Sequence, residues 1–330
     1  MSLEVRKKFS FEHKIKGFGF KSHFETESFK ILNQEILDAV HVGGLFVVSG
    51  VMGVGKTLAI RNITKKLKSD RKVIVCDSSS VEKPRLKIGD LIRTMFMDIC
   101  PDMPIKEIPT KLENKERILF KEIDKKGKDI VFFIDNAHEI HHGTLQSFKN
   151  LYDLARMRCK RAVTIVLVGQ PRLHNMLNSA KMEAIGHRAE NIRFQVMNIE
   201  EKTSYIEWLT KKARGRFSTK QKVFASDKAL ELFASSLATP LQIENYLNIA
   251  LESVHDIAGK NITEEIVKKI FERNIDGIEY ELARMGYTSK EIAEFTGLRK
   301  LEIDKFLKGM LDKRRNEEIE DTLIKSGISI

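Results

Sequence analysis

The feature that most constrains how this chain can fold is a glycine-rich turn between an apolar run and a helical pattern. Residues 45–48 are apolar and β-rich, as in a buried parallel strand, and residues 58–67 have helical periodicity. Between them stand Gly50, four further residues and then Gly-Lys-Thr at 55–57, which fit the pattern G-x-x-x-x-G-K-[ST]. The pattern predicts a P-loop, which directs backbone N–H groups and a helix N-terminus at a phosphate chain. The strand and helix around the turn disfavour a chance match.

Each residue type in this loop has its own role. The glycines supply backbone angles and a close approach that a Cβ would block. Lys56 is expected to reach the β- and γ-phosphates and the Thr57 hydroxyl to coordinate Mg²⁺, so the expected cofactors are ATP and Mg²⁺. The residues expected to hold the nucleotide are Gly50, Gly53, Val54, Gly55, Lys56, Thr57 and Leu58.

A second motif lies well downstream of the loop. Residues 129–134 form an apolar run that ends in Asp135, as in a Walker B strand. We expect this strand to lie beside the P-loop strand, because ligands of α/β sheets bind at the carboxyl ends of the strands. Asp135 would then join Thr57 in holding the metal ion and its water shell. A buried strand that ends in a capping aspartate is the alternative.

Two further positions are candidates for the hydrolysis step. Asn136 follows Asp135, and an amide can position a water but cannot accept its proton. ATP hydrolysis is therefore expected either to be slow or to use Glu139, one helical turn later. The sequence does not decide between these two possibilities. Gln170, just beyond an apolar strand at 162–168, is a candidate sensor of the γ-phosphate, with a plain strand-to-helix turn as the alternative.

Composition limits the class of protein. A chain of 330 residues with 42% apolar residues and a mean hydropathy of −0.27 is expected to form about two domains with a sizeable core. No apolar run reaches the ~20 residues that span a bilayer, so a cytoplasmic protein without a membrane partner is expected. Three widely spaced cysteines indicate neither a disulfide framework nor a metal site. The net charge of +11 and pI near 9.4 favour a polyanionic partner, above all nucleic acid.

The order of the patterns predicts an α/β P-loop fold with a parallel sheet, followed by helices alone. We expect an N-terminal arm at 1–27, the ATPase core at 28–198, an α-helical lid at 199–275 and a C-terminal helical segment at 276–330. Within the last segment, the strongly charged stretch 308–325 is expected to be a solvated helix.

The C-terminal segment has the pattern of a helix-turn-helix. Ala293 is small where two helices would meet, and Gly297 allows the tight turn between them. On this template Arg299, Lys300 and Lys305 lie on the exposed recognition helix, where they would contact DNA. A helical hairpin that docks protein partners is an equally good interpretation.

Several motifs together resemble one family. The P-loop, Asp135-Asn-Ala-His, Val-Gly-Gln-Pro-Arg-Leu from residue 168, Gly186-His-Arg and Thr239-Pro-Leu-Gln-Ile resemble the AAA+ ATPases of the ExeA/TniB/MuB/TnsC group. The resemblance covers about residues 30–255. It implies that Arg188 is an arginine finger that reaches the nucleotide of the next subunit, and hence that the protein forms a homo-oligomeric ring or helical filament.

Two departures from the family pattern stand out. Asn136 replaces the usual glutamate, and Leu241-Gln242 stand where a sensor arginine usually reaches the phosphates from the lid. Both departures point to slow, switch-like ATP turnover.

The ExeA branch carries a membrane segment and a cell-wall-binding portion that do not stand out here, so the chain is more similar to the transposition regulators, TnsC in particular. That resemblance implies an assembly on double-stranded DNA that works with a transposase and target-selector proteins. It also implies that the loop after the second strand faces the central channel. Here that loop carries Lys83, Arg85 and Lys87, which would contact phosphates, with a solvated basic loop as the alternative. The rival functions are a helicase loader or replication initiator, and a nucleotide-sensing signalling ATPase without a DNA role.

Overall fold

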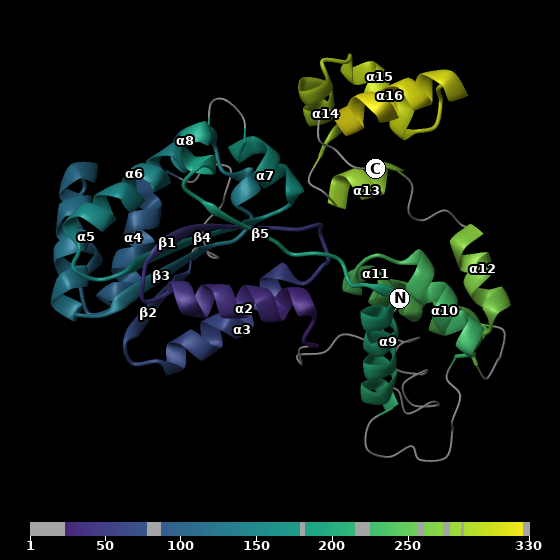
Figure 1. Ribbon diagram of the computed structural model, residues 1–330, viewed down its shortest axis with the longest axis horizontal. Helices are drawn as coiled ribbons and strands as arrows, with labels where there is room; N and C mark the ends of the chain where they lie inside the picture. Colours follow the sequence, from purple (N-terminus) through teal and green to yellow (C-terminus); the bar gives the residue numbers. More distant parts are fainter. Residues whose placement is uncertain are drawn as a thin grey trace.

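The computed structural model describes residues 24–77, 87–178, 182–214, 225–256, 261–272, 278–284 and 287–325. Its centre is a parallel five-stranded sheet in the order β2-β3-β4-β1-β5. In chain order the strands are β1 Gly44–Ser49, β2 Val73–Asp77, β3 Asp129–Ile134, β4 Val163–Gly169 and β5 Glu190–Arg193. The α/β class with a parallel sheet is therefore confirmed (Figure 1).

Helices cover both faces of this sheet. The first face carries α2 (Glu27–Ala39) and α3 (Lys56–Ser69), and the second carries α4 (Ile88–Ile99), α5 (Leu112–Lys126) and α6 (His142–Arg158) (Figure 1). Successive strand residues point to opposite faces, so Phe46 and Val48 pack in the first core and Leu45 and Val47 in the second. Burial on both faces explains why these strands are continuous apolar runs.

The strand order corrects one expectation. β3, which ends at Asp135, is not beside the P-loop strand β1, because β4 lies between them and pairs with both. Val48 is opposite Val168 in one ladder, and Ile134 is opposite Leu167 in the other. The apolar runs of β3 and β4 are alike in sequence, so only their tertiary packing determines which one takes the central place.

Four helices follow the sheet and form a core of their own. They are α9 (Ile199–Arg214), α10 (Asp227–Ser236), α11 (Pro240–Asp256) and α12 (Glu264–Glu272). Leu209, Phe233 and Leu247 lie fully buried among them. The expected helices are present. The helix α10 begins after Ser226, whose hydroxyl accepts a hydrogen bond from the backbone N–H of Ala229.

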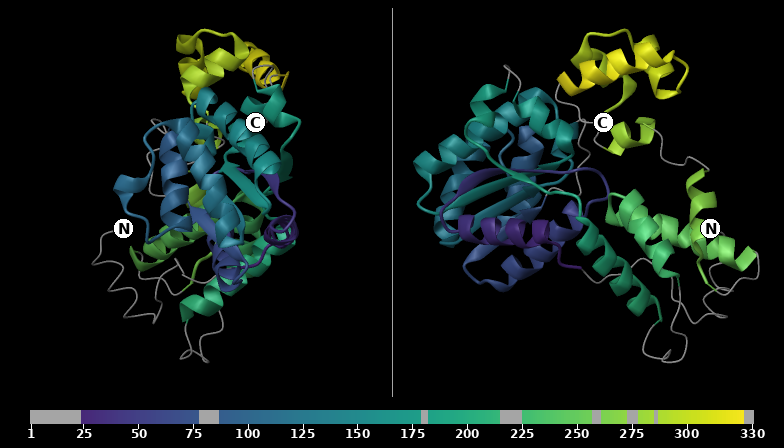
Figure 2. Two further views of the ribbon diagram at one scale, coloured as in Figure 1. Left: turned by 90° about the vertical axis from the view of Figure 1, so that its left-hand side faces the viewer. Right: turned by 45° about the vertical axis from the view of Figure 1, so that its right-hand side comes forward.

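The C-terminal helices form a further group, which is separate from these four helices (Figure 2). They are α13 (Ile278–Arg284), α14 (Ser289–Thr296), α15 (Lys300–Leu307) and α16 (Lys313–Lys325). Gly297 ends α14 with a φ of 72°, and Ile292 and Phe306 pack between the helices.

The expectation of a solvated helix at 308–325 is correct only in part. The helix α16 begins at Lys313, and Ile319 and Leu323, four residues apart, are buried in the core of this group. The many charges of this segment hid a narrow apolar stripe. None of the helices in the described part of the chain is long and apolar enough to cross a membrane.

Candidate nucleotide-binding site

The P-loop connects β1 to α3, and two of its glycines have left-handed backbone angles. Gly55 has a φ of 107° directly before α3, and Gly53 has a φ of 83°. An L side chain rarely adopts these angles, so both positions require glycine. A Cβ on Gly53 would also lie 2.7 Å from the Cβ of Leu241, so the helical lid touches the loop at this point.

Lys56 is turned into the loop that precedes it. Its Nζ donates hydrogen bonds to the carbonyl oxygens of Gly50 at 2.6 Å and Val51 at 2.9 Å, and the residue is 8% exposed. Burial lowers the pKa of Lys56 to about 8, and the carboxylate of Asp135 opposes this shift. The ammonium group is thus held by neutral carbonyls in a partly dry loop, where phosphate oxygens would be stronger acceptors.

The structure brings Thr57 and Asp135 together. The Thr57 hydroxyl donates to Asp135 Oδ2 at 2.8 Å, although the two residues lie on β-strand connections that are far apart in sequence. A hydroxyl and a carboxylate are hard oxygen ligands that suit Mg²⁺. The described residues contain no group of three or more His, Cys, Asp or Glu that could hold a metal ion. Mg²⁺ usually keeps several waters and binds substrate phosphates alongside one or two carboxylates.

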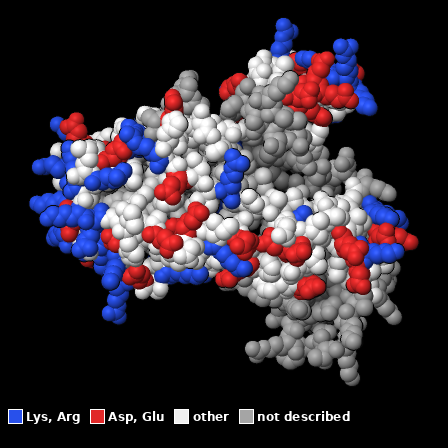
Figure 3. Space-filling view, viewed as in Figure 1, with Lys and Arg blue, Asp and Glu red and all other residues white. Residues whose placement is uncertain are grey.

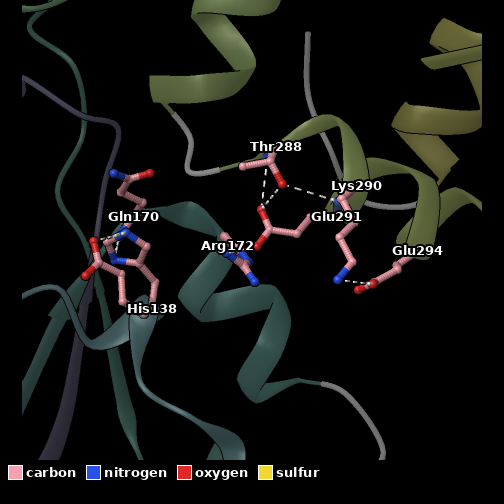
Figure 4. Close-up of polar contacts among 8 residues, drawn as sticks. His138, Gln170, Arg172, Thr288, Lys290, Glu291 and Glu294 are labelled. Atoms are coloured by element: carbon pink, nitrogen blue, oxygen red, sulfur yellow. Dashed lines mark hydrogen bonds and ion pairs between the residues drawn. The ribbon is translucent and has the colours of Figure 1, made fainter. Parts of the chain in front are cut away.

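The central strand β4 lies between β1 and β3, so the residue after it, Gln170, follows the strand that separates the P-loop from Asp135. The backbone N–H of Gly50 donates to the carbonyl of Gly169 at 3.3 Å, which joins the end of β4 to the start of the P-loop. The next residue, Gln170, stands at the N-cap position of α7 (Pro171–Leu177), and its buried Oε1 has no hydrogen-bond partner among the described residues (Figure 4). A buried acceptor usually has a partner, so this atom marks a place where a ligand or water fits.

His138 is a residue that the sequence reasoning missed. It lies on the short 3-10 helix η3 (Ala137–Glu139), is 6% exposed, and its Nδ1 accepts the backbone N–H of Gln170 at 3.4 Å (Figure 4). Burial, helped by the nearby charges of Arg172 and Lys56, lowers the pKa of His138 to about 4. The imidazole is therefore neutral near pH 7 and couples the segment after Asp135 to the end of β4.

The two candidates for water activation differ in their surroundings. Asn136 is exposed and has a φ of 54°, the left-handed region that asparagine tolerates better than most residues, and its N–H donates to Asp135 Oδ1 at 2.8 Å. The carboxylate of Glu139 is 45% exposed and lies 3.8 Å from His138 Nε2. In the described part of the chain Glu139 makes no hydrogen bond or ion pair with a P-loop residue.

An aromatic pocket adjoins the P-loop on the lid side. Its walls are the rings of Phe24, Tyr205 and Trp208 and, opposite them, the P-loop residues Val54, Gly55 and Leu58. Tyr205 and Trp208 are nearly parallel, with ring centroids 5.7 Å apart, and Phe24 stands edge-on to both.

The pocket has a polar end, formed by Tyr205 and Glu244. The Tyr205 hydroxyl donates to Glu244 Oε1 at 2.5 Å, and burial together with this carboxylate raises the pKa of Tyr205. Aromatic faces stack readily on bases. The sequence held one clue to this pocket: Trp208 is the only tryptophan, three residues after Tyr205 on one face of a helix.

The lid contacts the loop through the residue that replaces the sensor arginine. The backbone N–H of Leu241 donates to the carbonyl of Gly53 at 3.3 Å. Gln242 is turned to its own helix start, where its Oε1 accepts from the N–H groups of Ala238 and Thr239. The contact between the lid and the loop is therefore made by a backbone hydrogen bond and by the apolar side chain of Leu241, while Gln242 caps the start of its own helix.

Arg188 lies away from the P-loop of its own chain. It is exposed on the connection between α8 (Glu183–Gly186) and β5, and it forms an ion pair with Asp153 at 3.3 Å. Exposure is compatible with an arginine that acts on another subunit, and that role stays a prediction.

The candidate DNA contacts are only partly described. Lys83 and Arg85 lie outside the described residues, and Lys87 is exposed at the start of α4. Arg299, Lys300 and Lys305 are exposed on or directly before α15, as the helix-turn-helix template predicts. Their contact with DNA stays a prediction.

The C-terminal helices are tied to the helix that follows Gln170. Arg172 in α7 forms an ion pair with Glu291 in α14, which also completes the N-terminal cap of α14 with Thr288 (Figure 4). Next to this pair, the side chain of Asn175 donates to the Tyr287 hydroxyl at 2.6 Å. These links join the C-terminal group to the element that starts at the nucleotide-binding edge.

Comparison with known proteins agrees with this geometry. Residues 40–177 match the family model of the AAA domain. General secretion pathway protein A of Aeromonas hydrophila is 24% identical over 176 residues, which are 51% of this chain and 29% of that protein. The chain thus spans less than a third of the length of this relative.

Solved structures share the fold. Cdc6p of Pyrobaculum aerophilum superposes with a TM-score of 0.56 at 14% identity, over 94% of this chain and 84% of that one. The ORC1 protein of Aeropyrum pernix, solved in complex with DNA, gives a TM-score of 0.50 at 12% identity, over 91% and 82% of the two chains. Residues 40–177 are thus similar to an AAA domain, and with the P-loop and the Thr57–Asp135 pair they form the core of a P-loop ATPase whose cofactors are ATP and Mg²⁺.

Proposed function

We propose that this protein is an ATP-switched, DNA-binding regulator of transposition that assembles on duplex target DNA and recruits or activates a transposase. One observation carries the proposal. Both the lid and the C-terminal helices contact elements of the nucleotide site, through Leu241 on Gly53 and through Glu291 on Arg172. A change at the phosphates can therefore reach both groups of helices through direct contacts.

The residues of the site have distinct roles in this proposal. Lys56 and the P-loop N–H groups bind the phosphates, while Thr57 and Asp135 hold the metal ion, which neutralises phosphate charge when bound. The buried, unpartnered Oε1 of Gln170 lies on the strand between them and is suited to position water. The base stacks in the pocket around Trp208. Asn136 lacks the carboxylate that would accept a proton, so the ATP-bound state persists.

The DNA role rests on charge and on relatives. The net charge of +11 suits a polyanion, and the fold is shared with an ORC1 protein solved with DNA. The narrower transposition role rests on the resemblance to TnsC in the motifs of residues 30–255. In that role the duplex passes through the centre of a ring or filament, and Arg188 completes the nucleotide site of the neighbouring subunit.

A replication initiator or helicase loader is the second candidate. The likeness to Cdc6p extends over 94% of this chain and so includes the lid and C-terminal helices. Both candidates bind duplex DNA with ATP. They differ in the protein recruited, so co-sedimentation of the DNA-bound assembly with either a transposase or a replicative helicase from the same source separates them.

The first test is assembly on DNA. Wild-type protein with a non-hydrolysable ATP analogue and linear duplex is expected to form rings or filaments visible by electron microscopy. Lys56→Ala should abolish both ATP binding and assembly, because it removes the one ammonium group aimed at the phosphates. Nucleotide binding is followed by titration with a fluorescent ATP derivative. Unchanged nucleotide affinity in Lys56→Ala contradicts the proposed site, and the absence of ATP-dependent DNA assembly in the wild type contradicts the proposed function.

A further inference from the structure

The amino edge of the sheet, opposite the nucleotide site, carries a concentration of positive charge. The turns into the three neighbouring strands β2, β3 and β4 and the helix ends beside them all contribute. The cations, here called the basic rim, are Lys68, Arg71, Lys72, Lys125, Lys126, Lys128, Arg158, Lys160 and Arg161. Apart from half-buried Lys128, all are exposed.

The carboxylates of the rim accept hydrogen bonds from the backbone of the turns, and Asp129 also contacts His41 Nδ1 at 2.8 Å. Asp70 accepts the backbone N–H of Lys72 at 2.8 Å, Asp124 accepts that of Lys160 at 2.8 Å, and Asp129 accepts that of Ala162 at 3.2 Å. These hydrogen bonds hold the carboxylates close to the backbone of the turns, while the long cationic side chains extend from the surface. The acids thus shape the three turns, and the cations form their outer surface.

The rim cations have few acidic partners. Among the described residues, Lys125 is the one rim cation in an ion pair, with Glu122 at 3.5 Å. Elsewhere charges alternate: Figure 3 shows red and blue interspersed on the lid and on the C-terminal helices, but mostly blue along the left-hand edge of the core. A surface adapted only for solubility usually mixes both signs.

The spacing of the rim makes its charges act together. Neighbouring strands are about 4.8 Å apart, so the three turns span roughly 10 Å. This is close to the Debye length of about 8 Å at physiological ionic strength, so an approaching polyanion meets the summed field. Lysine and arginine on long flexible stems contact phosphates without reading bases.

We propose that the basic rim binds the phosphate backbone of nucleic acid, at a place separate from the site that responds to ATP. This goes beyond the ATP-dependent assembly on a central duplex, because the rim lies at the amino ends of strands whose carboxyl ends hold the P-loop and Asp135. Binding at the rim therefore needs neither nucleotide nor oligomer. A membrane surface is the less favoured partner, since the exposed large apolar side chains that the described residues place on this side, Met157 near the end of α6 and Val42 before β1, stand on separate elements and form no apolar face.

The test compares two variants of equal charge. The rim variant replaces Lys72, Lys126, Lys160 and Arg161 by glutamine. The control replaces one arginine and three lysines that are exposed, make no ion pair in the described structure and lie on the outer faces of α3 and the lid, namely Arg61, Lys65, Lys228 and Lys269. All eight are surface positions, so both variants are expected to fold.

Duplex binding is measured without nucleotide over a range of salt concentrations. We expect the rim variant to bind at least about tenfold more weakly, while the control changes little. The log-log salt slope of the rim variant should fall by about 0.9 for each phosphate that the protein no longer neutralises. Equal weakening in both variants, or unchanged binding in the rim variant, overturns the inference.

Two further measurements separate this inference from its alternatives. Assembly on duplex with the ATP analogue should persist in the rim variant, so a failed inference is distinguishable from a failed proposed function, in which the wild type does not assemble. Vesicles of phosphatidylserine and phosphatidylcholine are the second probe. Rim-dependent binding to vesicles together with unchanged duplex binding would show that the partner is a membrane and overturn the inference.

Discussion

At the scale of single residues, backbone conformation explains one departure from the family pattern. The family resemblance predicts glutamate where Asn136 stands, and the φ of 54° at Asn136 is the one positive value found on a described residue other than glycine. Asparagine tolerates this region because its short amide bonds locally. The amide at this position therefore serves the turn that carries Asp135, in addition to whatever it contributes to positioning water.

This gives the variant Asn136→Glu two opposing effects. A carboxylate beside Asp135 should raise ATP turnover, and a barrier lower by about 1.4 kcal/mol is a tenfold gain. A glutamate at this φ should also lower the free energy of unfolding by about 1 kcal/mol. Phosphate release and urea unfolding measure the two effects. Asn136→Gly is the matched control, which relieves the backbone without adding a carboxylate. Loss of turnover in Glu139→Ala combined with no gain in Asn136→Glu would make Glu139 the catalytic residue.

The buried His138 predicts how stability depends on pH. Its pKa is about 4 in the fold and about 6.5 when unfolded, so below pH 6.5 the unfolded chain binds the extra proton. The contribution of neutral His138 to the free energy of unfolding is thus fully present above pH 6.5. It is lost as the pH falls toward 4, by up to about 3 kcal/mol. Urea unfolding at pH 7 and pH 5 should show a smaller loss in His138→Gln than in the wild type. His187→Gln, which removes an exposed imidazole, should behave as the wild type; if all three proteins lose stability equally, His138 is not responsible.

At the scale of elements, α7 connects two parts of the molecule. Its N-cap Gln170 ends the strand between β1 and β3, and its side chains Arg172 and Asn175 bind Glu291 and Tyr287 of the C-terminal group. The ion pair is mostly buried, with 24% and 18% of the two side chains exposed. A charged hydrogen bond of this kind is worth about 1.5–3 kcal/mol, enough to hold the C-terminal group on α7.

Arg172→Ala should therefore loosen the C-terminal group without harming its own fold. We expect faster amide hydrogen exchange in α7 and α14, because the ion pair that joins them is removed while the Thr288–Glu291 cap remains. Lys290→Ala is the control, since Lys290 pairs with Glu294 inside α14 (Figure 4). Equal exchange in both variants would mean that the contact between α7 and α14 does not depend on this ion pair.

At the scale of the whole molecule, the proposed assembly on DNA leads to a prediction about which loop contacts the duplex. The loop after β2 carries Lys83, Arg85 and Lys87, spaced two apart, so in an extended segment all three point the same way. If the loop faces a central channel, these cations grip phosphates and binding is nearly independent of base sequence.

Replacing these three cations by glutamine should weaken ATP-dependent duplex binding and flatten its salt dependence, by about 0.9 in log-log slope for each phosphate that is left without its cation. The affinity of the monomer for ATP should not change, because none of the three is in the P-loop. Duplex binding at several salt concentrations with the ATP analogue measures the effect. Unchanged affinity and slope would exclude this loop and direct attention to Arg299, Lys300 and Lys305 on α15.

The sequence by itself determined the local features of this protein. The P-loop, the helix after it and the strand ending in Asp135 were predicted within a few residues, because side-chain periodicity and glycine angles act over short distances. The α/β class followed from the alternation of these elements.

Tertiary structure alone decided what depends on residues far apart in the chain. It inserted β4 between β1 and β3, which puts Gln170 between the P-loop and Asp135. It also seated Leu241 on Gly53, closed the aromatic pocket around Trp208 and gathered the basic rim from three separate turns. Contacts of this kind depend on how helices cover the two apolar faces of the sheet. The free energy of that packing is summed over the whole core, so no local sequence pattern contains it.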